Sequence, residues 1–190
     1  MSNQLLADPP PSESEEAGDA PPLRITVHKI ANYMQRDEYS EGGISTGDLA
    51  ELRRIDPEEP FTPALWKVLL KYVPDDDRLS EEQERQWAIL LMAMAHCVGL
   101  HKPGASFGAA LAEAGWSELR FVRLMEAEGD HLVKQIRRLA KYLSSKNQEA
   151  DWSDAAWLLF VQEGKKATKI RQNIARDYYK RLYVEENKSD

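Results

Sequence analysis

Basic side chains recur at helical spacing in the second half of the chain, and the chemistry that suits them is the binding of phosphate. Lys134, Arg137 and Lys141 are three and four residues apart, so on a helix they share one face, with Arg138 beside them. No carboxylate lies at a compensating position in this segment, and a guanidinium binds phosphate through two parallel hydrogen bonds. The face therefore fits an anionic ligand, although an ordinary solvated helix face explains the same pattern.

Basic residues also gather in three other places. Arg120 and Arg123 are one helical turn apart, and Arg53-Arg54 is the only adjacent basic pair among residues 1–100. Lysines dominate the last predicted helix, and their point charge is less specific for phosphate than the arginine fork. The candidates for phosphate contact are Arg53, Arg54, Arg120, Arg123, Arg137, Arg138, Lys141, Lys165, Lys169 and Arg176.

The sequence shows no catalytic or metal-binding constellation. His96 adjoins the only cysteine, Cys97, but a metal site needs three or four convergent ligands and this pair has no evident third. The sequence also lacks a phosphate-binding glycine loop and a dinucleotide fingerprint. The aspartate run at 75–77 is interpreted as a solvated turn. We therefore expect no metal, no cofactor and no enzymatic activity.

Helix signals recur from residue 23 onward, and they predict an all-α protein of about eight to nine helices with no sheet. Thr62 precedes a proline at the first helical position, Ser80 forms a capping box with Gln83, and Ser117 and Asp151 occupy N-cap positions. One short helix is predicted to end near residue 54. The other predicted helices span about 63–72, 81–98, 107–114, 118–126, 131–143, 152–160 and 167–184.

Charge is unevenly distributed along the 190 residues. Residues 1–100 hold 9 Lys and Arg against 19 Asp and Glu, whereas residues 101–190 hold 16 against 13. Because screening at physiological salt acts over about 8 Å, local basic faces bind anions despite an overall net charge of −7. We predict a disordered acidic, proline-rich tail at 1–22, a helical bundle at 23–100 and a second bundle with basic faces at 101–190.

The composition predicts a soluble, cytoplasmic protein. The sequence has no run of eighteen apolar residues that would span a membrane, and its N-terminus lacks the pattern of a secretory signal. A single cysteine excludes an intramolecular disulfide, which suits a reducing compartment.

Four segments in order resemble the CasB family, the small subunit of the type I-E CRISPR surveillance complex called Cascade. They are residues 47–54, 107–143, 151–154 and 174–179, and the likeness extends over about 24–184. The resemblance implies an all-α fold of two small bundles without enzymatic activity. The acidic tail lies outside the family's pattern, so the resemblance implies no role for it.

The resemblance also implies a place in antiviral defence. Family members are present as two copies in a ribonucleoprotein that contains CRISPR RNA, large and backbone subunits, and the target and displaced DNA strands. The arginines at 53, 54, 120, 123, 137 and 138 match the family's basic positions, whereas Lys141 stands where an arginine is expected. Sequence-independent contact with nucleic-acid backbone would stabilise the R-loop. The alternative that stays open is a structural adaptor between proteins with no direct DNA contact.

Overall fold

The computed structural model describes residues 22–36, 38–73 and 79–187. These ranges contain ten α-helices and no strand, which confirms the all-α prediction; nine helices have seven or more residues, and α2 is a single turn of four. The helices are α1 (Pro22–Gln35), α2 (Glu38–Glu41), α3 (Thr46–Arg53), α4 (Pro63–Tyr72), α5 (Glu81–His96), α6 (Phe107–Glu113), α7 (Glu118–Met125), α8 (Gly129–Lys146), α9 (Trp152–Phe160) and α10 (Gly164–Glu186).

Side-chain caps start several helices where the sequence predicted them. The Thr62 hydroxyl accepts from the Leu65 N–H at the start of α4, and Ser80 and Gln83 form both bonds of the capping box of α5. Ser117 is the N-cap residue of α7, but its side chain makes no capping hydrogen bond. The capping bonds of Thr62, Ser80 and Gln83 satisfy backbone N–H groups that the first helical turn leaves without partners.

Several helix boundaries differ from the prediction, most clearly those of α8 and the start of α10. α8 begins at Gly129, two residues before the predicted start, and it continues to Lys146, where Asn147 takes a left-handed conformation with φ of 51°. The last helix, predicted to start at about residue 167, begins three residues earlier at Gly164. The φ of 82° at Gly164 suits glycine, because other residues meet a steric penalty there.

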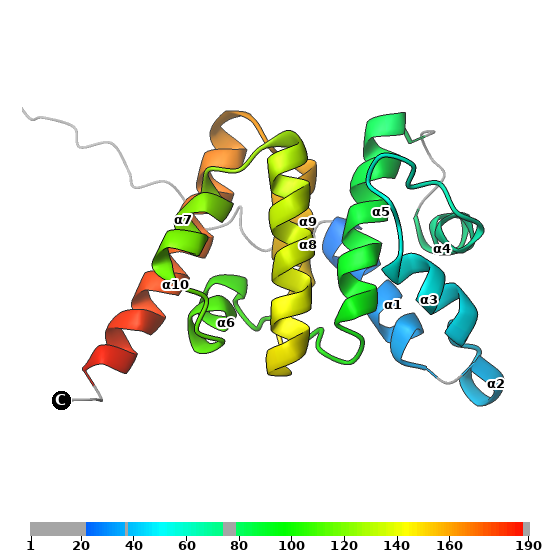
Figure 1. Cartoon of the computed structure of the whole chain (residues 1–190), viewed down its shortest axis with the longest axis horizontal. Coiled ribbons are helices and arrows are strands. Elements are labelled where there is room, and N and C mark those ends of the chain that lie inside the picture. The colour runs from blue at the N-terminus through cyan, green and yellow to red at the C-terminus, as the bar shows by residue number, and fades with distance from the viewer. Residues whose placement is uncertain (1–21, 37, 74–78, 188–190) are drawn as a thin grey trace, which may run out of the picture.

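Figure 1 shows α8 and α9 in the middle of the molecule, with α5 alongside. The helices α1, α3 and α4 lie on the side of α5, and α6, α7 and α10 lie on the other side. All residues from Trp87 to Ala95 of α5 are buried, as expected for a helix with neighbours on every face. α5 joins the two ends of the molecule, since it packs against α3 and α4 as well as α8 and α9, and α1 also packs on α9.

The α6–α10 pair closes the other end. A Cβ atom added at Gly108 would overlap the backbone of Ile174 and Tyr178, so glycine permits the close approach of these helices. The rings of Phe121 and Tyr178 stack with centroids 3.8 Å apart, and the Tyr178 hydroxyl donates to the Trp116 carbonyl. These contacts fix α7 and α10 against α6.

Some predictions fall on residues outside the described ranges. They include residues 1–21 of the predicted tail and the aspartates at 75–77, whereas Pro22 is the first residue of α1. The predicted boundary between bundles at 100/101 stays a prediction; α1 of the first half packs on α9 of the second. No helix of the described ranges has the length and apolarity needed to cross a membrane.

Candidate nucleic-acid interface

Three basic side chains converge where α3, α5 and α8 meet, and we call Arg53, Arg137 and Lys141 the central cluster. The Nε–H of Arg53 donates to the Ala95 carbonyl at 2.7 Å, which ties α3 to the last turn of α5. Two residues further, the Cys97 thiol contacts the Ala140 carbonyl of α8, with 3.2 Å between Sγ and oxygen. Lys141, next to Ala140, is therefore brought to the same end of α5 as Arg53, and Arg137 lies one helical turn before it.

The position of Arg53 has a local physical cause. The last carbonyls of a helix have no intrahelical partner and carry partial negative charge, so a guanidinium at this point is favourable. The Arg53 side chain is exposed although it makes this hydrogen bond to α5. The neighbouring Arg54, the C-cap residue of α3, is also exposed. Of the two adjacent arginines, Arg53 is therefore held by a hydrogen bond to α5, and Arg54 extends into solvent.

The electrostatic field of the central cluster acts on His96, the last residue of α5. Burial lowers the pKa of His96 below its usual value of 6.5, and the charges of Lys141, Arg53 and Arg137 lower it further. Three cations from two helices thus raise the positive potential at a single place. The neighbouring Cys97 is inert, since burial raises the pKa of its thiol to about 12.

Arg137 and Arg138 point to different sides of α8, because successive residues of an α-helix point about 100° apart. Arg137 lies toward α5, where it lines a cavity of about 300 Å³ with Arg85. Arg138 is exposed one turn before Tyr142, whose hydroxyl donates to the Ala114 carbonyl on the side of α6 and α7. The cavity has balanced charges, lined by Arg85, Lys134 and Arg137 against Asp56, Glu58 and Asp130.

A second basic region lies between α7 and α8. Arg120 and Arg123 are exposed on α7, and the Arg120 guanidinium lies 5.4 Å from the centre of the Trp116 ring. Trp116 meets Tyr142 edge to face, and the Lys146 ammonium lies 5.7 Å from the Tyr142 ring. The two aromatic rings therefore bridge the basic residues of these helices through cation–π contacts.

The third basic region is a stripe on α10, formed by Lys165, Lys169 and Arg176. All three are exposed on the face opposite the buried residues Ala167 and Ile174. As the sequence spacing predicted, they follow one another along a single helix face. The stripe is confined to one element, unlike the central cluster.

Arg171 lies on the same helix but has a structural role. Its guanidinium donates to the carbonyl of Met125, the last residue of α7, to that of Ala127 beyond it, and to that of Gln162 before α10. These bonds satisfy carbonyl groups at a helix end, which otherwise lack partners. Arg171 therefore fixes α7 to α10 rather than broadening the exposed stripe.

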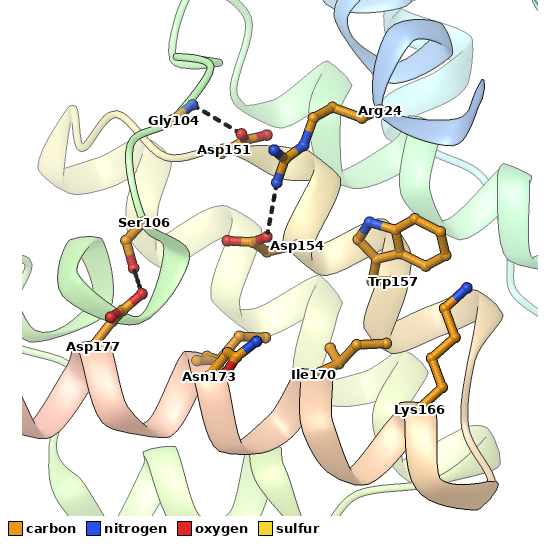
Figure 2. A pocket seen from close by; sticks show the side chains of 11 residues that line it. Arg24, Gly104, Ser106, Asp151, Asp154, Trp157, Lys166, Ile170, Asn173 and Asp177 are labelled. Atoms are coloured by element: carbon orange, nitrogen blue, oxygen red, sulfur yellow. Dashed lines mark hydrogen bonds and ion pairs between the residues drawn. The ribbon is translucent and has the colours of Figure 1, made fainter. Parts of the chain in front are cut away.

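A cavity of about 460 Å³ lies between α1, α9 and α10 (Figure 2), and its charge does not suit phosphate. Asp151, Asp154 and Asp177 line it, against the two cations Arg24 and Lys166. Burial raises the pKa of Asp154, whose ion pair with Arg24 is long at 3.8 Å between oxygen and nitrogen. Asp151 instead caps α9 and accepts the Gly104 N–H, so these carboxylates organise helix starts.

The sequence did not reveal two residues that the structure brings to the basic regions. His96 was considered only as a metal ligand, and the described residues contain no group of three ligand-type side chains suited to a metal ion. Arg85 of α5 was not considered, although it shares a cavity with Arg137. No spacing signal would have identified them, because their placement depends on packing between helices. Eight of the ten predicted residues lie in these three separate regions, and the exposed Arg54 and Arg138 belong to none of them.

Family and structural comparisons agree with the fold. Residues 48–179 match the family model of the CRISPR-associated protein Cse2. The chain is similar to CasB of M. ruber (18% identity, 87% of this chain and 98% of that chain, TM-score 0.66). It is also similar to CasB of Thermobifida fusca (19% identity, 82% and 94%, TM-score 0.62).

A further similar structure is a chain from the crystal structure of E. coli Cascade bound to a PAM-containing dsDNA target (19% identity, 83% and 96%, TM-score 0.62). No curated protein sequence matches the chain. The structural likenesses establish the fold, and the family model covers more than half of the residues. The chain belongs to the CRISPR-associated protein Cse2 family.

Proposed function

We propose that this chain is the non-catalytic small subunit of a Cascade-type CRISPR surveillance complex and holds nucleic-acid backbone in its central cluster. The convergence of Arg53, Arg137 and Lys141 from helices distant in sequence carries the proposal. Membership in the Cse2 family and the likeness to a chain of DNA-bound E. coli Cascade support the same assignment. The remaining candidates on α7 and α10 add secondary contacts to the same polyanion.

Such contacts would act on the R-loop. The RNA–DNA heteroduplex is about as stable as the DNA duplex it replaces, so the exchange of strands is nearly balanced. A few charge-assisted bonds to phosphates of the target or displaced strand therefore shift the balance toward the open state. The guide RNA supplies sequence recognition, and the arginines grip only sugar-phosphate.

The partners in this proposal are CRISPR RNA, the two DNA strands, the large and backbone subunits, and a second copy of the chain. The test is reconstitution of the complex with the triple variant R53A/R137A/K141A in place of the wild-type subunit. We expect the complex to assemble and the R-loop to dissociate faster at physiological salt. An R-loop lifetime equal to that of the wild-type complex would contradict the proposal.

A structural adaptor is the second candidate, and one observation favours it. Apolar side chains are exposed on α7 and α10, including Leu119 at 63% and Tyr183 at 68%. Contiguous exposed apolar surface marks protein interfaces, and in the adaptor these side chains would provide it. In the adaptor, L119S/Y183S would prevent co-purification with the other subunits, while the triple central-cluster variant would leave R-loop lifetime unchanged.

A further inference from the structure

His96 lies within the central cluster and has no part in the function proposed above. Backbone contacts on both sides of it fix its position. The carbonyl of Ala95 accepts from Arg53 of α3, and the thiol of Cys97 contacts Ala140 of α8. The imidazole therefore lies between the two helices that carry the cluster.

Every charge that acts on His96 is positive. Arg53 comes from α3, and Arg137 and Lys141 come from α8; no charged group of α4 or α9, which also pack on α5, acts on it within the described ranges. Its Nε2 atom is buried, and no group of the described residues bonds to it. A proton at Nε2 in the free protein thus lacks both an acceptor and a neighbouring anion.

We propose that Arg53, Arg137, Lys141 and His96 form one phosphodiester-binding site, and that occupation of this site is coupled to the protonation of His96. The inference rests on the proposed function, because it needs a phosphate in the central cluster. A bound phosphodiester brings one negative charge among three positive ones, and an opposite charge within about 4–6 Å favours the protonated form of an imidazole. The proton comes from solvent, and no covalent bond to the ligand forms.

The direction of the pH effect follows from the two states of His96. In the free protein, burial and the three cations keep the pKa of His96 below 6.5, so the ring is neutral at pH 7. In the complex the pKa is higher, so binding takes up a proton at pH values between the two. Affinity therefore rises as pH falls, by at most about tenfold per pH unit for one proton.

The test is the affinity of the full chain for fluorescein-labelled dT and rU oligonucleotides of about 20 nucleotides. Anisotropy is measured at constant ionic strength between pH 6 and pH 8, where Asp and Glu side chains ordinarily stay ionised. We expect the wild-type Kd to be about three- to tenfold lower at pH 6. The H96Q variant should lose most of this dependence, and H131Q, which changes an exposed histidine of α8, should keep it.

The outcomes separate the inference from the proposed function. Binding with the same pH dependence in wild type and H96Q overturns the proton coupling alone. Failure to bind either oligonucleotide at any pH overturns the proposed function and the inference together. A dependence seen with dT, with rU or with both supports the coupling and identifies which strand chemistry fills the site.

A second measurement on the wild type avoids any effect of substitution on folding. The imidazole signal of His96, assigned by comparison with H96Q, is titrated by NMR with and without the dT oligonucleotide. We expect its pKa to rise when the oligonucleotide is present. An unchanged pKa of His96 in the saturated complex would overturn the inference.

Discussion

The central cluster and the α10 stripe contain the same kinds of residue but are built in different ways. Arg53, Arg137 and Lys141 come from two helices packed on a third, and a backbone carbonyl of α5 fixes one of them. Lys165 and Lys169 project from a single helix face into solvent. A preorganised group binds with less loss of side-chain entropy than free lysines do, so the comparison predicts that the cluster dominates binding.

The largest expected effect concerns the residue that supports the α10 side. R171A removes hydrogen bonds to three carbonyls, those of Met125 at the end of α7, Ala127 beyond it and Gln162 before α10. We expect a loss of about 2–4 kcal/mol in the free energy of unfolding. K169A, on the exposed face of the same helix, should change it by less than about 0.5 kcal/mol. Urea unfolding of both variants measures the difference, and equal midpoints would deny Arg171 this role.

Substitution of the two adjacent arginines of α8 sharpens the comparison within one helix. R137A removes a member of the central cluster, whereas R138A removes an exposed residue on another side of α8. We expect R137A to weaken single-stranded DNA binding about fivefold and R138A by less than about twofold. Gel-shift titrations at one salt concentration suffice. Equal losses would show that only the number of basic residues matters.

The pH dependence of stability is the third way to compare the regions. Because burial and three cations lower the pKa of His96 below its unfolded value, the unfolded state binds more protons near pH 6. This contribution to stability is present above the unfolded pKa and is lost as pH falls through it. We expect H96Q to lose less stability than wild type between pH 7.5 and pH 5.5. H131Q should lose as much stability as wild type does over this pH range. Identical losses in all three proteins would show that His96 does not cause the pH dependence.

The smallest expected effect is at the cavity lined by Asp151, Asp154 and Asp177, and its dependence on pH has the opposite sign to that of His96. Burial raises the pKa of Asp154, so its ionised form opposes folding at neutral pH; this opposition declines as pH falls through the raised pKa and ends below the ordinary value of 3.8. D154N keeps an oxygen that accepts the Phe107 N–H. We therefore expect a gain of about 0.5 kcal/mol at pH 7.5 and no gain at pH 3.5. Thermal unfolding at both pH values tests this, and a loss at pH 7.5 would mean that the pair with Arg24 dominates.

Local signals in the sequence were sufficient to predict the helices from α3 onward, although α1 and α2 were not among the predicted helices. Thr62 and Asp151 cap helices where they were expected to, because an N-cap bond spans only two or three residues. Ser117 shows the limit of such signals, since its position was predicted but its hydrogen bond is not made. The stripe on α10 could also be predicted from the sequence, because the helical period alone defines which residues share a helix face.

The central cluster required information that no local pattern contains. Arg53 and Lys141 are separated by most of the chain, and only the packing of α3 and α8 on α5 brings them to the same place. Arg171 matched the basic pattern of its helix, but its bonds depend on where α7 ends. Sequence periodicity assigns a residue to a helix face. Tertiary packing decides whether that face contacts solvent, a carbonyl group or another basic residue.

The most direct test of the central claim is the salt dependence of single-stranded DNA binding by two matched triple variants. Each phosphate neutralised on a single strand contributes about 0.7 to the slope of log affinity against log salt. We expect R53A/R137A/K141A to reduce the slope by about 2 and to weaken binding equally for two unrelated sequences. The stripe variant K165A/K169A/R176A should reduce it by less than about 1. Equal reductions, or a larger one for the stripe variant, would contradict the claim that three helices assemble the principal phosphate site.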